Sequence, residues 1–132
     1  GGKSKLFEGT FGSQTTGTIS LSSIGFTPNA VHCIFGPYDT TNTKDIDNIS
    51  IGFAVKTGAT SSDMAVAYNY FQQSGTSAFD THPNVIGRLA FGSATFHNLT
   101  ITAWNNDDCT VTKSINNTPT DRTLKYAIMV TG

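Results

Sequence analysis

Charged residues are scarce in this 132-residue chain. Asp, Glu, Lys and Arg together make up 13% of it, the net charge at pH 7 is −1, and Glu8 is the only glutamate. The eight basic residues are scattered along the chain. The sequence therefore lacks the concentrated basic face with which proteins neutralise nucleic-acid phosphates. We expect no nucleic-acid partner.

Long apolar runs are also missing. No apolar stretch approaches the roughly 20 residues that a membrane-spanning helix needs. The chain opens with Gly1-Gly2-Lys3 rather than with the basic and then apolar pattern of a secretory signal. We therefore expect no insertion into a membrane.

Strong helix formers are rare, whereas β-branched and aromatic residues are common. Leucine occurs only at Leu6, Leu21, Leu89, Leu99 and Leu124. Thr, Ser, Asn and Gly supply most of the polar positions, which favours strands and turns over helices. A length of 132 residues suits one domain. The sequence predicts a single all-β domain over residues 1–132.

Short alternating runs recur about every ten residues and are separated by turn residues. In the run from Ala30 to Phe35, for example, Val31, Cys33 and Phe35 share one face. This pattern is typical of a β-sandwich or a β-barrel. It predicts nine strands, at residues 3–11, 17–22, 30–35, 49–55, 64–71, 85–91, 95–104, 109–112 and 124–131. We expect a two-sheet antiparallel β-sandwich of jelly-roll type, with a closed barrel as the alternative.

In two neighbouring predicted strands, the bulky residues fall on one face. Ile49, Ile51, Phe53 and Val55 share one face of their strand, and Met64, Val66, Tyr68 and Tyr70 share one face of the next. Residues 72–83 contain Ser74-Gly75 and His82-Pro83, and they indicate a long exposed loop.

The residues that usually carry chemistry are dispersed. Cys33 and Cys109 lie in separate predicted strands, where they are either two buried thiols or a disulfide between strands. The histidines His32, His82 and His97 show none of the spacings of a metal site. No nucleophile elbow or phosphate-binding loop is present. We therefore expect no catalytic residues, no metal, no cofactor and no enzyme activity.

Acidic residues come close together only in predicted loops and turns. Asp107 and Asp108 fit a turn, where aspartate has a structural role. Asp39, Asp45 and Asp47, with Asn42 and Asn48, carry oxygens of the kind that bind calcium. Their spacing lacks the glycine and the final glutamate of an EF-hand, so a loop is the simpler interpretation.

Aromatic residues beside amide groups suggest one candidate binding site. Sugar-binding sandwiches combine aromatic surface with a few well-placed polar groups. Trp104 precedes a run of polar residues, and further candidates lie before and within the predicted long loop. The predicted ligand-binding residues are Trp104, Asn105, Asn106, Asp107, Tyr70 and His82. The alternative is that Trp104 packs against the opposite sheet while the amides only turn the chain.

Several segments together resemble short β-rich modules of structural proteins in tailed phages and prophages. They are Phe7-Glu-Gly-Thr-Phe11, Ile24-Gly-Phe-Thr-Pro-Asn-Ala-Val31, Ile51-Gly-Phe-Ala54, residues 64–67, Val85-Ile-Gly87 and the closing Leu124-Lys-Tyr-Ala-Ile-Met-Val-Thr-Gly132. The resemblance spans nearly the whole chain. The chain departs from it at the hairpin tip, which reads Asp107-Asp108-Cys109 in place of Asp-Gly-Phe.

The resemblance implies a module on a particle surface, often trimeric, with no shared catalytic residues. It implies a capsid-decoration or fibre-type protein of the virion surface, whose partners are other virion proteins and copies of itself. The alternative function is a carbohydrate-binding, lectin-like module that recognises a glycan on the host surface.

Overall fold

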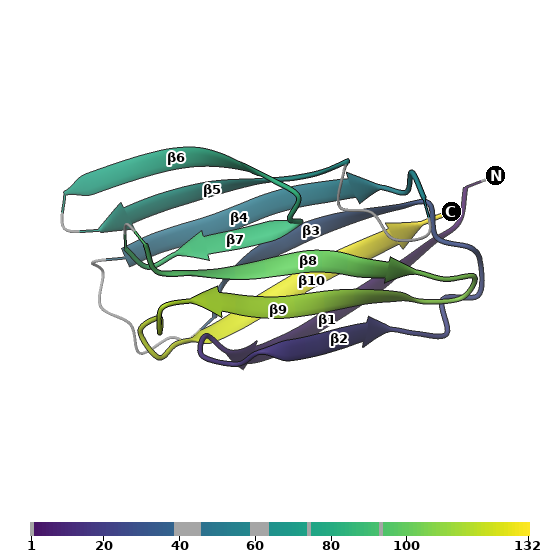
Figure 1. Ribbon diagram of the computed structural model, residues 1–132, viewed down its shortest axis with the longest axis horizontal. Coiled ribbons are helices and arrows are strands. Elements are labelled where there is room, and N and C mark those ends of the chain that lie inside the picture. The colour runs from purple at the N-terminus through teal and green to yellow at the C-terminus, as the bar shows by residue number, and fades with distance from the viewer. Residues whose placement is uncertain (1, 39–45, 59–63, 74, 93) are drawn as a thin grey trace.

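The computed structural model describes residues 2–38, 46–58, 64–73, 75–92 and 94–132. Those residues form ten strands in two antiparallel sheets and no helix (Figure 1). The all-β sandwich is confirmed. The strands are β1 Ser4–Gly12, β2 Gly17–Leu21, β3 Ala30–Pro37, β4 Ile46–Val55, β5 Ala65–Gln73, β6 Thr76–Pro83, β7 Gly87–Ala90, β8 Phe96–Trp104, β9 Cys109–Asn116 and β10 Thr123–Thr131.

The two sheets differ in width. The larger has the order β1-β10-β3-β4-β5-β6, and the smaller has the order β2-β9-β8-β7 (Figure 1). The first strand pairs with the last, and the second pairs with the second-to-last, which is how a jelly roll wraps. In the larger sheet, β3, β4, β5 and β6 are neighbours in the same order as in the sequence. The architecture is therefore a sandwich of two separate sheets rather than a closed barrel.

Residues 72–83 are not the long loop that the sequence predicts. They form the end of β5, a turn and β6, and the hairpin pairs Tyr70 with Phe79 and Tyr68 with Thr81. Gly75 lies in the turn with φ +81°, a conformation that favours glycine. As the outermost strand of its sheet, β6 contacts solvent along its length and so has the polar composition of a loop. Its proline, Pro83, is at the strand's end, where the missing N–H is tolerated.

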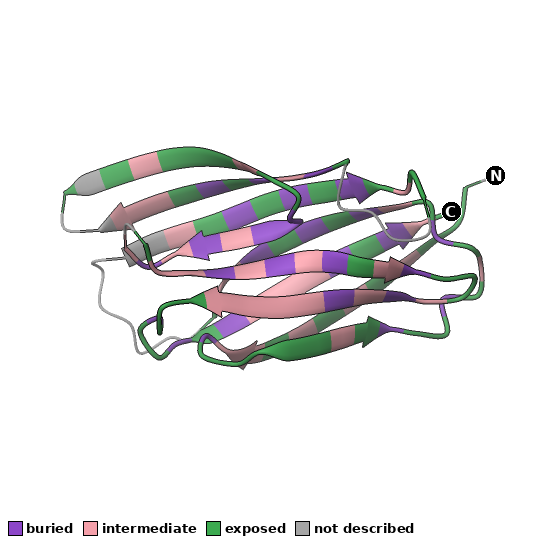
Figure 2. Cartoon of the chain, in the orientation of Figure 1, coloured by how far each residue is buried: buried purple, intermediate pink, exposed green. Residues whose placement is uncertain are grey.

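The core lies between the sheets and follows the alternation of the strands (Figure 2). Val31, Cys33 and Phe35 are buried as predicted, and His32 and Ile34 point outward. The other buried aliphatic residues of the core include Leu21, Ile86, Leu89, Leu99, Ile101, Val111, Leu124, Ile128 and Val130.

The two cysteines are buried in this core as free thiols. Burial raises the pKa of Cys33 to about 12. Burial, together with the nearby carboxylate of Asp108, raises the pKa of Cys109 to about 11. Both residues act as small apolar side chains, which confirms the first of the two interpretations of the sequence.

The central strands β4 and β5 turn their small side chains inward. Ser50, Gly52 and Ala54 are buried, whereas Ile49, Ile51, Phe53 and Val55 are exposed. The reason is the close approach of the second sheet, because a Cβ on Gly52 would overlap the backbone carbonyl of Ile86, just before β7. Bulky residues fit only on the other side of the strand.

Polar side chains of the larger sheet form hydrogen bonds with the backbone groups of β7 that face no neighbouring strand. The N–H of Arg88 donates to Ser50 Oγ at 3.0 Å, and the N–H of Ala90 donates to Asn69 Oδ1 at 3.1 Å. Asn48 Nδ2 donates to the carbonyl of Ala90, and Asn69 Nδ2 donates to Asn48 Oδ1 at 2.8 Å. These contacts explain why polar residues are buried here, since an unpaired backbone group would be costly.

A β-bulge in β8 brings Trp104 into the core. Ile101 pairs with Val111 and Ala103 pairs with Thr110, so Thr102 is an extra residue in β8. Strict alternation would have placed Trp104 on the outward side with Thr102. The bulge reverses that parity, and 3% of the Trp104 surface is exposed.

His97 is buried in an aromatic cluster at one end of the core. Its ring lies 5.1 Å from that of Phe11 and 5.6 Å from that of Phe35, measured between centroids. Nε2 lies 3.0 Å from the carbonyl oxygen of Thr15, so this nitrogen donates. Desolvation by burial is the largest cause that lowers the pKa of His97, and Lys113 contributes in the same direction.

The buried neutral histidine predicts a loss of stability in mild acid. Unfolded His97 titrates near pH 6.5 and folded His97 titrates lower. Its contribution is therefore complete above pH 6.5 and is lost as the pH falls toward the folded-state pKa. Urea unfolding of the wild type should show this decline, and His97→Phe should show a shallower one. His82, whose pKa is also lowered, is present in both proteins. Equal pH slopes in the two proteins would contradict the prediction.

Candidate functional site

The predicted binding residues after β8 have structural roles. Asn105 closes the turn, with its N–H donating to the Asp108 carbonyl at 2.9 Å. Asp107 Oδ1 accepts the N–H of Gly25 at 2.7 Å, and the Asp107 carbonyl accepts that of Ile24 at 3.0 Å. The turn is thereby joined to the segment before β3.

The prediction that the Trp104 ring stacks on a sugar is wrong. The Trp104 side chain packs in the core cluster, so its ring face is not available at the surface. Asn105 and Asn106 are exposed beside it, but without an accessible aromatic ring they do not form the predicted kind of site. The alternative interpretation, in which Trp104 packs inside, describes the structure.

Tyr70 and His82 lie on the other sheet and on its opposite sides. Tyr70 points outward from β5, where its hydroxyl lies 3.0 Å from Gln72 Oε1. His82 on β6 pairs with the buried Ala67. Burial and the positive charge of Arg88 lower the pKa of His82. The six predicted residues are therefore not brought together into one site.

The described residues offer no group of three or more His, Cys, Asp or Glu side chains that could bind a metal. Asp39, Asn42 and Asp45 of the calcium interpretation lie outside those residues. No helix in the described ranges is long and apolar enough to cross a membrane. The expectation that the chain is not an enzyme stays a prediction.

The most distinctive surface is the outer side of the six-stranded sheet. Every large hydrophobic residue with high exposure in the described ranges lies on this sheet or directly beside its strands. We call the surface that they form the apolar face. Its members are Leu6, Ile34, Tyr38, Ile49, Ile51, Phe53, Val55, Met64, Tyr68, Tyr70, Phe79 and Met129.

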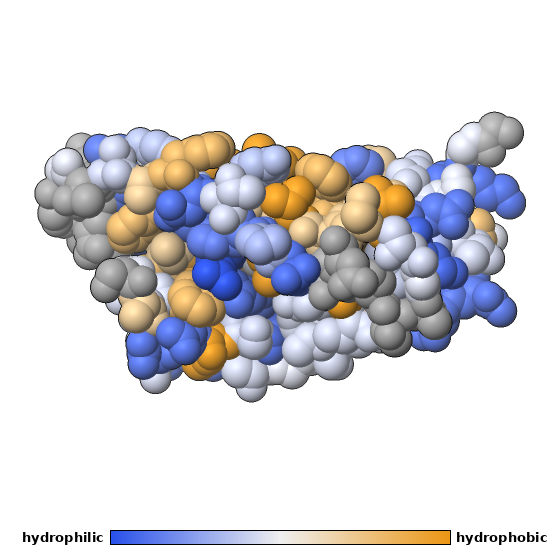
Figure 3. Space-filling view, turned by 45° about the horizontal axis from the view of Figure 1, so that its top comes forward, coloured by the Kyte–Doolittle hydropathy of each residue, from blue (hydrophilic) through white to orange (hydrophobic). Residues whose placement is uncertain are grey.

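Strand register makes the apolar face continuous. One cross-strand row runs from Ile34 through Ile51 to Tyr68. A neighbouring row runs from Ile49 through Tyr70 to Phe79, and the rings of Tyr68 and Phe79 stack with centroids 6.2 Å apart. Phe79 is 68% exposed. Figure 3 shows hydrophobic side chains exposed along the upper margin of the molecule.

The outer side of the four-stranded sheet has the opposite character. The register aligns Thr18 with Thr112 and Thr112 with Thr100 across three strands. The hydroxyls of Thr102 and Thr112 are 2.8 Å apart. Among the described residues, no large hydrophobic side chain of this sheet is highly exposed. The two outer surfaces therefore present different chemistry to a partner.

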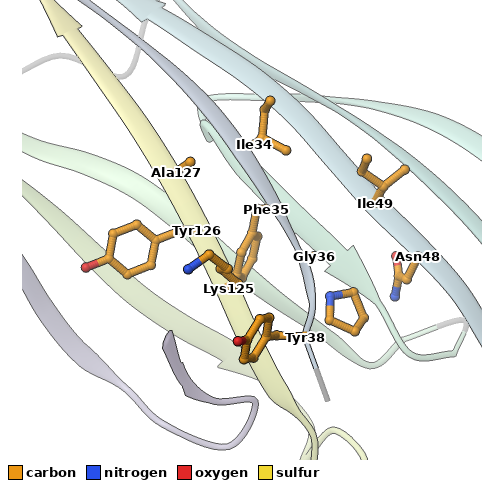
Figure 4. Close-up of a pocket in the computed structure, with 10 residues that line it drawn as sticks. Ile34, Phe35, Gly36, Tyr38, Asn48, Ile49, Lys125, Tyr126 and Ala127 are labelled. Carbon is orange, nitrogen blue, oxygen red and sulfur yellow. The ribbon is translucent and has the colours of Figure 1, made fainter. Parts of the chain in front are cut away.

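Shallow hollows lie between the protruding side chains of the apolar face. One, of about 360 Å³, is bordered by Ile34, Tyr38, Ile49 and Lys125, and its lining includes Gly36 (Figure 4). A second, of about 250 Å³, is lined by Ile49, Ile51, Tyr68, Tyr70 and Phe79. A third, of about 390 Å³, lies toward β1, and its lining includes Leu6, Ile34, Phe53, Ala127 and Met129.

One ion pair lies at the β1 side of the apolar face. Lys125 Nζ is 2.6 Å from Glu8 Oε2 and 5.3 Å from the ring centroid of Tyr38. The hydrogen bond to Glu8 raises the pKa of Lys125. The two opposite charges neutralise each other. The face as a whole offers mainly apolar contact area.

No protein-family model matches the sequence, and no curated protein matches it. Among solved structures, the chain is similar to the tailspike protein of Acinetobacter baumannii phage AM24, with a TM-score of 0.41 and 12% sequence identity. The similarity covers 98% of this chain and 26% of the tailspike chain. The chain thus spans about a quarter of the tailspike's length. A similarity of this strength does not assign a function.

Proposed function

We propose that this chain is an assembly module of a virion surface, of fibre or capsid-decoration type, that acts by protein–protein contact. The observation that carries the proposal is the concentration of exposed large hydrophobic side chains on one sheet face. Contiguous exposed apolar patches of this kind mark interaction surfaces in soluble proteins. The resemblance of the sequence to phage structural modules supports the placement on a particle surface.

The size of the side chains supports a contact of useful strength. Burying a Leu, Ile, Phe or Met side chain fully contributes about 1.5–3 kcal/mol. Association costs about 4–15 kcal/mol in lost freedom of motion. Because these side chains are already partly covered in the free chain, several of them must be buried together. The continuous rows of the apolar face provide such a set.

Protein is a better occupant of this face than a glycan. A sugar needs hydrogen-bonding groups around an aromatic ring. The hollow that contains Tyr68, Tyr70 and Phe79 is otherwise lined by Ile49 and Ile51, and its polar groups are limited to the tyrosine hydroxyls and the backbone. Such a lining matches apolar side chains.

Hydroxyl-radical footprinting tests the proposal, because it labels the Met, Phe and Tyr side chains that this face contains. We expect Phe53, Tyr68, Phe79 and Met129 to be labelled in the isolated, diluted chain and protected in the assembly purified from its natural source. Phe96 on the four-stranded sheet, which lies under Arg88 at 4.0 Å, serves as the internal control. Unchanged labelling of the apolar face in the assembly would contradict the proposal.

A further inference from the structure

We infer that the apolar face is covered by the same face of another copy of this chain. The inference rests on the proposed function, since it names the partner of the surface described above. Three features of the face support a copy of the chain as the occupant: its charge, its size and its relief.

The charge of the face suits contact with itself. When a surface packs on its own copy, any net charge meets like charge, which costs several kcal/mol. Among the side chains that the structure describes, the carboxylate and ammonium groups beside the face are Glu8 and Lys125, which already pair at 2.6 Å. The exposed imidazole of His32 lies within the face, between Met129 and Phe53 in the strand register. The centre, around Ile34 and Ile51, is apolar. Two copies therefore meet without like-charge repulsion, whereas a partner chosen by charge would find no complementary pattern here.

The size of the face suits a stable contact. It comprises six strands of eight to ten residues. With strands about 4.8 Å apart and residues about 3.3 Å apart, this corresponds to about 750 Å². A standard protein interface takes about 800 Å² from each partner. One face against another is therefore sufficient, without a contribution from the rest of the chain.

The relief of the face contains both protrusions and hollows. Phe79 and Leu6 stand out, with 68% and 59% exposure. The hollows lie where Gly36 and Ala127 contribute little or no side chain. Packed β-sheets interdigitate their side chains at a separation of about 10 Å. A copy of the same face carries the protruding side chains that such hollows accept.

Sedimentation velocity over a wide concentration range tests the inference on three proteins. The wild type should form a defined dimer, because a face that packs on its own copy closes as a two-fold pair. Ile51→Asp, at the centre of the face, should weaken association by at least about 100-fold, because it buries an unpaired carboxylate. Thr18→Asp, an exposed residue of the other sheet, adds the same charge and should associate like the wild type.

A second variant separates folding from association. Phe79→Ala introduces no charge and should weaken association by about 10-fold through lost apolar contact. Circular dichroism should show a wild-type spectrum for both face variants, since their side chains are exposed in the single chain. A wild type that is monomeric at every concentration, or an oligomer that Ile51→Asp leaves intact, would overturn the inference.

Failure of the inference and failure of the proposed function give different results. If the isolated chain is monomeric but its apolar face is protected in the natural assembly, the proposed function stands and the face binds a different protein. A face that stays labelled in the assembly would remove the function itself.

Discussion

Gly52→Ala is expected to lower the free energy of unfolding by at least about 3 kcal/mol, the upper range for overpacking a core. For a chain of this size, that corresponds to a fall of about 10 °C in the melting temperature. The added Cβ would overlap backbone atoms of Ile86, and backbone gives way less easily than a flexible side chain. β7 would have to move away from β4. The measurement is urea unfolding followed by circular dichroism.

Gly58→Ala is the matched control for this substitution. A Cβ at Gly58 meets nothing within 4 Å, and its backbone is not left-handed. Its stability should stay within about 0.5 kcal/mol of the wild type. If Gly52→Ala were as stable as this control, β7 would not lie against β4 as described, and the reason for the outward-facing bulky residues would be lost.

Asn69→Ala is expected to lower the free energy of unfolding by about 3 kcal/mol, because it leaves buried polar groups without partners. Asn69 is 1% exposed. Its Nδ2 donates to Asn48 Oδ1 at 2.8 Å and to the Ile49 carbonyl at 3.0 Å, and its Oδ1 accepts the N–H of Ala90 at 3.1 Å. The alanine variant removes these contacts and opens a cavity between the sheets.

Asn106→Ala, at an exposed turn position, is the control for the asparagine substitution and should stay within about 0.5 kcal/mol. Hydrogen exchange adds a local measurement. The Ala90 amide should exchange faster in Asn69→Ala, while amides between β1 and β10 should lose protection only as far as global stability falls. Unchanged protection of Ala90 would show that Asn69 does not satisfy the edge of β7.

The strands that follow simple alternation can be predicted from sequence. In β3, apolar residues occupy the buried side, so period-two burial identifies the core face directly. The sequence pattern misses β6 because an edge strand contacts solvent and carries the polar residues of a loop. Only pairing with β5 distinguishes the two.

The exposed face cannot be predicted from hydrophobicity. In β4, the bulky residues share one side and the small ones share the other, and hydrophobicity alone assigns the bulky side to the core. The informative signal is the run of small residues at alternate positions, Ser50, Gly52 and Ala54, which indicates that another backbone comes close. Which strand approaches depends on tertiary structure.

The prediction that Trp104 belongs to a surface site is wrong for a comparable reason. Alternation in β8 places this residue with Thr100 and Thr102, on the outward side. The bulge at Thr102 inserts one residue and reverses the parity of the later residues in the strand. Nothing in the local sequence marks the bulge. An aromatic residue next to polar turn residues therefore has the sequence pattern of a surface feature although it is buried.

Radical footprinting of the two outer surfaces in the natural assembly is the most direct measurement of which one makes contact. If the apolar face makes the contact, labelling at Phe53, Tyr68, Phe79 and Met129 will fall several-fold relative to the free chain. Labelling at Phe96 will not change. Protection at Phe96 with full labelling at the other four residues would place the contact on the wrong sheet and contradict the account.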